Sequence, residues 1–96
     1  MNRAMPLLDA DAVTAALAGL PGWGREGDEI VKTYERPTFP DAIAFVVRIG
    51  FFAERADHHP DLDVRWRKVR VALTTHDKGG ITEKDVALAR EIEGIP

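Results

Sequence analysis

The chain has 96 residues, no cysteine, and 13 lysines and arginines against 16 aspartates and glutamates, which gives a formal net charge of −3. A chain of this length buries roughly 60 to 65% of its unfolded surface, enough for one hydrophobic core, so a single domain over residues 1–96 is expected and two domains are excluded. With 45% hydrophobic and 30% charged residues, the composition excludes intrinsic disorder, and the lack of cysteine excludes disulfides, thiolate metal sites and a cysteine nucleophile.

The first elements predicted are a short helix and a β-hairpin. Asp9 can cap a helix that runs to Leu17 or Ala18, and the Pro21-Gly22 pair follows its end. Trp23 then begins a short extended segment and is expected to anchor the packing. Turn-forming residues occupy 26–28, and residues 29–36 are rich in β-formers.

A long helix is predicted next. Thr38 and Asp41 form a variant of the capping box, and the helix can continue to the residue before Pro60. Apolar residues recur at spacings of three and four, as in a buried stripe: Ala42, Phe45, Val46, Ile49, Phe52, Ala53 and Ala56. Val47 and Phe51 widen this surface, which indicates a second face that meets another subunit or another element.

The second half of the chain predicts another hairpin and a last helix. Apolar residues alternate with polar ones on both sides of a reversal near Arg67-Lys68: Leu62, Val64 and Trp66 before it, Val69, Val71 and Leu73 after it. In this register Trp66 takes a core position, with the wall of a ligand site as the alternative. A flexible loop is expected over 77–80, and Thr82 with Asp85 forms a capping-box variant that gives Asp85 a structural role.

The predicted order of elements is α-β-β-α-β-β-α. Each hairpin is local and needs no parallel crossover, so we expect an α+β fold in which a four-stranded antiparallel sheet has its helices packed on one face.

Neither a membrane nor a nucleic-acid partner is expected. The longest apolar stretch, Ile43 to Ala53, is interrupted by Arg48, and the first residues lead into no signal-like segment. We therefore expect a soluble, cytoplasmic protein. The cations at 65, 67, 68 and 70 alternate with apolar residues, which is typical of a solvated strand face in a mildly acidic protein.

The three histidines are the residues best suited to chemistry. His58 and His59 close the predicted long helix and His76 follows the last strand, so an antiparallel pair of strands can bring all three to one edge of the sheet. Glu54 lies four residues before His58, on the same predicted helical face, where its carboxylate can support an imidazole. The residues alone leave three interpretations open: an acid/base site, a zinc held by Glu54, His58 and His76, and no site.

The pattern Glu54-x-x-x-His58-His59-Pro60, followed by Trp66, His76 and Asp85, resembles that of the pterin-4a-carbinolamine dehydratase family. Gly22-Trp23, the strand with Lys32 and the stretch from Phe39 to Phe45 resemble the first half of the family, so the likeness covers nearly the whole chain. Trp66 stands where the family also accepts tyrosine, and Lys78 and Gly79 differ from the animal members.

The resemblance implies dehydration of 4a-hydroxytetrahydropterin to quinonoid dihydropterin, which recycles the cofactor after an aromatic amino acid hydroxylase has used it. It implies that His58, His59 and His76 are catalytic, and that the pterin is contacted by Glu54, Asp57, Thr74, Thr75 and Asp77. It also implies a homodimer or homotetramer, and neither a metal nor a redox cofactor is expected. Some members also act as dimerisation cofactors for a transcription factor, so the alternative is an interaction module that uses the apolar face of the long helix.

Overall fold

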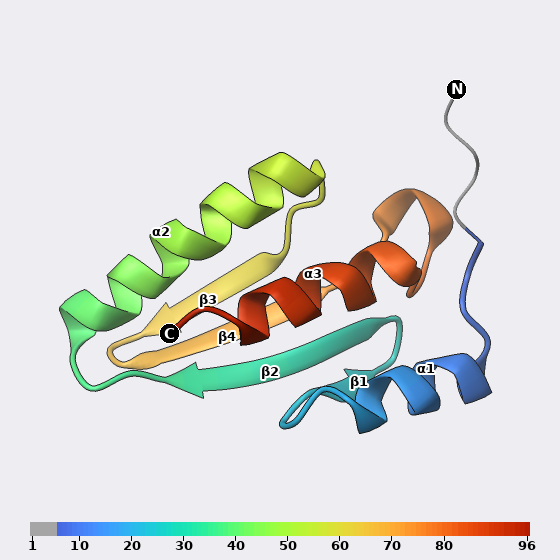
Figure 1. Ribbon diagram of the computed structural model, residues 1–96, viewed down its shortest axis with the longest axis horizontal. Helices are drawn as coiled ribbons and strands as arrows, with labels where there is room; N and C mark the ends of the chain where they lie inside the picture. Colours follow the sequence, from blue (N-terminus) through green and yellow to red (C-terminus); the bar gives the residue numbers. More distant parts are fainter. Residues whose placement is uncertain (1–5) are drawn as a thin grey trace.

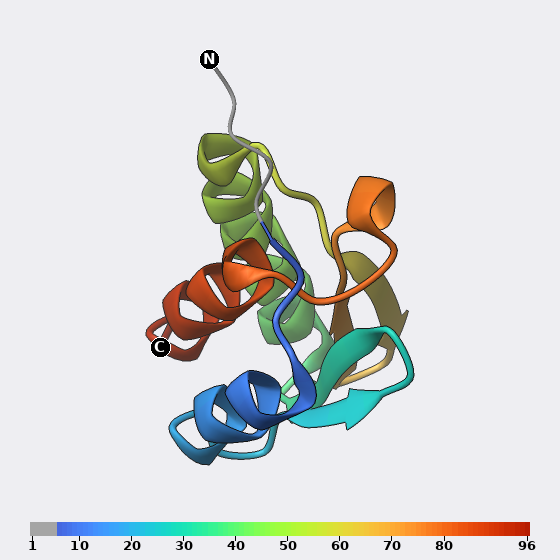
Figure 2. The ribbon, with the colours of Figure 1, turned by 90° about the vertical axis from the view of Figure 1, so that its right-hand side faces the viewer.

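The structure, a computed structural model, describes residues 6–96 and contains helices on one side of a single sheet (Figures 1 and 2). In chain order the elements are α1 (Ala10–Ala18), β1 (Gly24–Glu26), β2 (Glu29–Glu35), α2 (Phe39–Ala56), β3 (Asp61–Arg65), β4 (Lys68–Leu73), the 3₁₀ helix η1 (His76–Lys78) and α3 (Glu83–Glu93). The strands lie in the order β1-β2-β4-β3, and every neighbouring pair is antiparallel. The predicted α+β fold is confirmed.

The predicted helix starts are also confirmed. The Asp9 carboxylate accepts the Ala12 N–H at 2.8 Å, and Thr38 Oγ1 accepts the Asp41 N–H at 3.1 Å. At α3 both halves of the capping box predicted for residues 82 and 85 are present. Each cap satisfies backbone donors that have no partner inside the helix, which is why these short sequence signals locate the helix starts so well.

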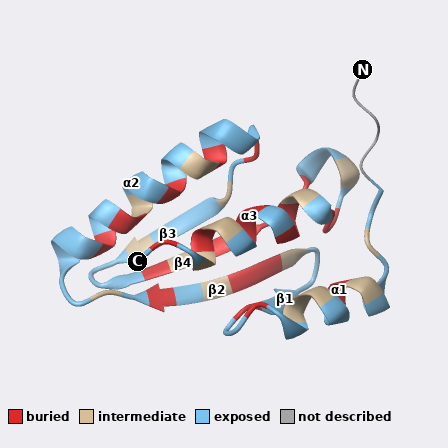
Figure 3. Ribbon diagram, viewed as in Figure 1, coloured by how far each residue is buried: buried red, intermediate tan, exposed pale blue. Residues whose placement is uncertain are grey.

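The core lies between the sheet and the helices. The central strands β2 and β4 bury apolar side chains, and all three α-helices cover them; the fully buried members include Val13, Ile30, Phe45, Ile49, Val69, Val71, Leu88 and Ile92. Figure 3 shows the buried segments along β2, β4 and α3, whereas much of the outer surface of α2 is exposed. The two hairpins are joined by the pairing of β2 with β4. This pairing fixes where the carboxyl end of β4 lies relative to the rest of the sheet.

The end of α3 is tied to the sheet by one carboxylate. Oε2 of Glu93 accepts hydrogen bonds from Lys32 Nζ at 2.6 Å, from Trp23 Nε1 at 3.2 Å and from the Tyr34 hydroxyl. Desolvation acts to raise the pKa of Glu93, but the hydrogen bonds from Lys32 and Tyr34 outweigh it and leave the pKa below its ordinary value. Burial, and then the hydrogen bond to Glu93, raise the pKa of Tyr34 far above its ordinary value. The buried Trp23 is the packing anchor that the sequence predicts.

The long helix ends earlier than predicted. α2 stops at Ala56, not at the residue before Pro60, because Asp57 adopts the left-handed conformation (φ 50°, ψ 44°). The N–H groups of Asp57 and of the residue after it bond to the carbonyls of Glu54 and Ala53, both at 3.1 Å. This is the hydrogen-bond pattern of a Schellman motif, and aspartate tolerates the left-handed region better than most side chains. The two adjacent histidines therefore lie beyond the helix.

Trp66 does not take the core position that alternation predicts. β3 ends at Arg65, so the chain reverses at Trp66-Arg67, earlier than expected, and Trp66 has a left-handed φ of 53° and is 84% exposed. A turn residue lies outside the pleat, so the alternation of the strands does not apply to it. Leu62 is exposed as well, because β3 is an edge strand, whereas Val64 packs against the core.

Large apolar side chains remain exposed along one side of α2. Phe39, Ile43, Val47 and Phe51 follow one another at intervals of four residues and are between 41% and 74% exposed. This spacing places them on one helix face, which we call the α2 apolar stripe, and it is the second apolar face that the sequence predicts. Among the described residues, no helix combines the length and the hydropathy that crossing a bilayer requires.

Candidate active site

A pocket of about 290 Å³ lies where the chain leaving α2 meets the chain leaving β4 and the start of α3. Its lining contains Asp57, His58, His59, Thr74, Thr75, His76, Asp77 and Lys84. The structure thus brings the three histidines together. Among the site residues expected from the sequence, Glu54 is absent from the lining and contacts His59 instead.

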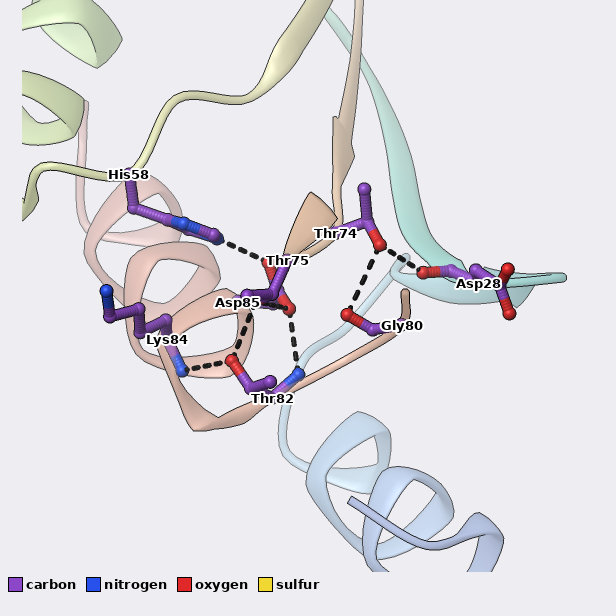
Figure 4. Close-up of polar contacts among 8 residues, drawn as sticks. All are labelled: Asp28, His58, Thr74, Thr75, Gly80, Thr82, Lys84 and Asp85. Carbon is purple, nitrogen blue, oxygen red and sulfur yellow. Dashed lines mark hydrogen bonds and ion pairs between the residues drawn. The ribbon is translucent and has the colours of Figure 1, made fainter. Parts of the chain in front are cut away.

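His58 is held by a buried carboxylate from α3. Its Nε2 lies 2.5 Å from Oδ1 of Asp85, a residue that is 0% exposed. Oδ2 of Asp85 accepts a hydrogen bond from Thr75 Oγ1 at 2.9 Å and another from the Thr82 N–H at 2.8 Å. Figure 4 shows these bonds converging on the one carboxylate. A buried carboxylate with three hydrogen-bond partners has its polar atoms satisfied, so Asp85 is a stable part of the core as well as a neighbour of the pocket.

The directions of these bonds fix the tautomer of the His58 ring. An ionised carboxylate only accepts hydrogen bonds, so Nε2 of His58 carries a hydrogen and donates it to Asp85. The Thr75 hydroxyl donates to Asp85 and accepts from the Thr82 hydroxyl at 2.7 Å. Nδ1 is then the ring nitrogen left for chemistry, as an acceptor in the neutral ring and a donor in the imidazolium. A carboxylate that orients an imidazole in this way is a recurring part of acid/base sites.

The prediction that Glu54 supports His58 is wrong. The left-handed Asp57 interrupts the helix between them, so His58 turns toward Asp85, and Oε1 of Glu54 lies 3.1 Å from Nε2 of His59 instead. The two side chains of this pair are 84% and 61% exposed. An exposed ion pair is screened by water and salt, so Glu54 orients His59 at the rim of the pocket without fixing it rigidly.

His76 is carried by a closed turn. Part of the segment expected as a flexible loop belongs to η1, which Gly79 caps with φ 72°. The Thr75 carbonyl accepts the N–H groups of Lys78 and Gly79, both at 3.0 Å, and the Thr75 N–H donates to the Gly80 carbonyl at 2.8 Å. These bonds close the turn, so the exposed His76 ring projects from a defined backbone.

Thr74 and Thr75, which the sequence predicts to contact the ligand, use their hydroxyl groups for hydrogen bonds within the protein. Thr74 Oγ1 lies 2.6 Å from the Asp28 carbonyl oxygen, to which it donates, and Thr75 Oγ1 belongs to the Asp85 network. Figure 4 shows both threonines between the end of β4 and the start of α3. Their side chains therefore hold the wall of the pocket in place.

Two residues at this site, Asp85 and Lys84, are not predicted as site residues from the sequence. From the sequence, Asp85 is expected only as a helix cap, although it is the last residue of the pattern that resembles the family, which was a signal for a place at the site. Lys84 is not singled out; it lines the pocket, and its side chain extends toward the His58 side of the cluster (Figure 4). No pattern in the sequence marks Lys84, because only the packing of α3 against the turn after β4 brings it there.

The predicted zinc alternative does not match this geometry. His58 Nε2 is committed to Asp85, and Glu54 pairs with His59. Within residues 6–96, no group of three or more His, Cys, Asp or Glu side chains is arranged to hold a metal ion. The described side chains therefore do not form the three-ligand set that a catalytic zinc needs.

Fold and pocket together define a small α+β protein with an imidazole and carboxylate site. Comparison with known proteins agrees with this description. The model of the family described as pterin 4 alpha carbinolamine dehydratase matches residues 6–95. The chain belongs to the pterin-4a-carbinolamine dehydratase family.

Individual relatives cover the same region. A protein of Roseiflexus sp. (strain RS-1) is 56% identical over 89 residues, which are 93% of this chain and 95% of the relative, and one of Chloroflexus aurantiacus (strain J-10-fl) is 53% identical over 91 residues, 95% and 98% of the two chains. Both are named provisionally as pterin-4-alpha-carbinolamine dehydratases. A crystal structure described as a transcriptional coactivator/pterin dehydratase from Brucella melitensis superposes with a TM-score of 0.89 at 30% identity and covers 92% of this chain and 96% of its own.

Proposed function

We propose that this protein dehydrates 4a-hydroxytetrahydropterins to quinonoid dihydropterins by histidine acid/base catalysis. The observation that carries the proposal is the pocket lined by His58, His59 and His76, in which two of the rings have carboxylate partners. Small-molecule pockets commonly measure about 300 to 1,000 Å³, so a pocket of about 290 Å³ suits one small heterocycle. Family membership supports the same substrate.

The reaction needs one acid and one base. The C4a–O bond breaks as the acid protonates the hydroxyl, which leaves as water, and the base takes the proton from N5, whose bonding electrons form the C4a=N5 double bond. One proton enters and one leaves, so no electron donor or acceptor is required. An imidazole with an ordinary pKa near 6.5 can act in either role at neutral pH, and a positioned acid or base contributes about 10² to 10⁴-fold.

His58 is the best-positioned of the three rings. Asp85 holds its tautomer and stabilises the imidazolium that forms when Nδ1 takes a proton. His59 and His76 are more exposed and exchange protons readily with water. We assign proton transfer at the reacting atoms to His58 together with one of these two rings.

The remaining charged residues of the lining can hold the pterin. Asp57 and Asp77 can accept hydrogen bonds from the N3–H and 2-amino groups of the pyrimidine ring, and Lys84 can donate to its 4-carbonyl oxygen. Within the described residues, none of these three side chains forms an ion pair. They are therefore free to make polar contacts with a ligand.

Turnover of a 4a-hydroxytetrahydropterin by the purified protein tests the proposal. We expect His58→Ala to lower kcat by about 10² to 10⁴-fold and His59→Ala and His76→Ala by smaller factors, since their rings are less constrained. Arg90→Gln, which changes an exposed residue of α3 paired only with Glu83, serves as the control. Wild-type protein that is no faster than buffer would overturn the proposal.

The α2 apolar stripe favours self-assembly, and we propose that it forms the contact between subunits of a homodimer or homotetramer. Apolar faces of this kind on a small protein are commonly covered by a partner. A second candidate function, docking of a partner protein on the stripe, draws support from the Brucella melitensis relative, which is described as a transcriptional coactivator as well as a pterin dehydratase.

Analytical ultracentrifugation of wild type and Phe51→Glu tests this assignment, because Phe51 is the most exposed member of the stripe. We expect an oligomer that dissociates in the variant and remains in Glu29→Gln, a control on β2. An oligomer that Phe51→Glu does not weaken would contradict it. A monomeric wild-type protein would also contradict self-assembly and would favour a different protein as the partner of the stripe.

A further inference from the structure

A second groove, of about 330 Å³, shares no lining residue with the histidine pocket. It lies between the connector that leaves β2 and the first half of α2, and is lined by Arg36 and Arg48 with Asp41, Phe45, Pro37 and Pro96. It therefore combines two guanidinium groups with an aromatic ring and two prolines.

These two guanidinium groups differ from the others in the described part of the chain. The side chains of Arg55, Arg65, Arg67, Arg70 and Arg90 each pair with a carboxylate, and Arg25 donates to the Gly27 carbonyl. Within residues 6–96, the arginines that have neither an ion pair nor a side-chain hydrogen bond are Arg36 and Arg48, and both line this groove. Among the arginines that the structure describes, the two unpaired guanidinium groups thus lie at one groove.

Arg36 is held rigidly. Its guanidinium carbon lies 4.0 Å from the centre of the Phe45 ring and 5.5 Å from that of Tyr34, and its backbone N–H bonds to the Arg67 carbonyl at 2.8 Å. Its Nε is buried and has no hydrogen-bond partner. A guanidinium that is stacked on an aromatic ring and has no carboxylate partner loses little further freedom when an anion binds, so the arrangement is suited to anion recognition.

Arg48 adds a second charge from the adjacent helix. It follows Phe45 by three residues on α2, and so lies on the same helix face. Asp41, the carboxylate in the lining, accepts a hydrogen bond from the Thr38 hydroxyl at 2.9 Å and forms no ion pair with either arginine. The side chains that line the groove therefore carry two cations and one carboxylate.

We propose that this groove is a binding site for an oxyanion, the phosphate or carboxylate group of a small molecule. Guanidinium groups match the paired oxygens of both groups bidentately. Phe45 and the two prolines supply an apolar wall for the organic part of the ligand. The site is separate from the pterin pocket, so its ligand can be bound while that pocket is occupied.

Amide chemical shifts of the full-length ¹⁵N-labelled protein, titrated with sodium phosphate and with sodium succinate at constant ionic strength, test the proposal. We expect saturable shifts centred on Ala44, Phe45 and Arg48. Tighter binding of phosphate identifies a phosphate-bearing ligand, and tighter binding of succinate a carboxylic acid.

Arg48→Gln should weaken binding about tenfold, as the loss of one charge-assisted contact at a partly exposed site predicts. Because Arg48 is exposed, this variant keeps the test usable if Arg36→Gln fails to fold. Arg55→Gln is the matched control, since it removes an ion-paired arginine from the same helix. Shifts that do not saturate, that centre on His76, or that Arg48→Gln leaves unchanged would overturn the proposal.

Discussion

Replacing Asp85 by asparagine tests whether the buried carboxylate sets the state of His58. The amide keeps the shape of the side chain but has one accepting oxygen and an NH₂ donor. Oδ2 of Asp85 serves two donors, Thr75 Oγ1 and the Thr82 N–H, whereas Oδ1 serves His58 alone. The asparagine oxygen is therefore expected at the Oδ2 position, with its NH₂ group against Nε2 of His58.

Two donors cannot face each other, so the ring must move its hydrogen from Nε2 to Nδ1. The nitrogen available for chemistry then has the wrong protonation state, and the charge that stabilises the imidazolium is gone. We expect kcat to fall by about 10² to 10⁴-fold with little change in KM. Hydrogen bonds to charged groups are worth about 1 kcal/mol more than neutral ones, so weakening three of them should lower the free energy of unfolding by about 2 to 3 kcal/mol.

Steady-state kinetics, urea denaturation and the ¹⁵N shifts of the imidazole ring measure these effects separately. Glu83→Gln, an exposed position two residues before Asp85 in α3, is the control and should change none of them. The ring shifts should report Nε2–H in the wild type and Nδ1–H in the variant. A variant that loses stability but keeps kcat within a factor of about three, with the ring hydrogen still on Nε2, would refute the assignment and leave Asp85 a purely structural residue.

Four further experiments have clear expected outcomes. The pKa of Glu93 is lowered in the folded protein, so the carboxylate contributes stability above the unfolded pKa near 4.3 and loses this contribution as the pH falls. The difference in unfolding free energy between wild type and Glu93→Gln should therefore shrink from pH 7 to pH 3. A constant difference would contradict this. The pKa of Tyr34 is raised, so for Tyr34→Phe the corresponding difference should persist below about pH 10 and shrink above it. Trp66→Gly should raise the free energy of unfolding by roughly 0.5 to 1 kcal/mol in urea denaturation. A left-handed non-glycine residue costs about 1 to 2 kcal/mol, and the greater chain entropy of glycine in the unfolded state offsets part of that gain. Trp66→Ala keeps the Cβ and should show no such gain, so equal effects of the two substitutions would contradict the strain argument. Dialysis against EDTA should leave pterin turnover unchanged, and a loss restored by zinc would instead favour the metal alternative.

Local signals in the sequence determined most of the fold. The caps at Asp9, Thr38 and Thr82, the β-formers of β2 and the alternation of β4 are local signals, and the structure confirms the elements that they predict. Antiparallel pairing within each hairpin, β1 with β2 and β3 with β4, follows from its short connection. The meeting of the three histidines at one pocket also follows, because the ends of a hairpin share one edge of the sheet.

Tertiary structure decided which partner each histidine has. The pairing of His58 with Asp85 joins residues far apart in the chain, and it depends on the left-handed turn at Asp57. Helical periodicity does not predict such a turn, because the apolar pattern ends before Asp57. Aspartate also marks a left-handed residue less clearly than glycine does. The exposed position of Trp66 was likewise set by where the hairpin closed. Sequence therefore determined which elements form and that the three histidines lie near one another, whereas packing determined which carboxylate contacts His58 and which contacts His59.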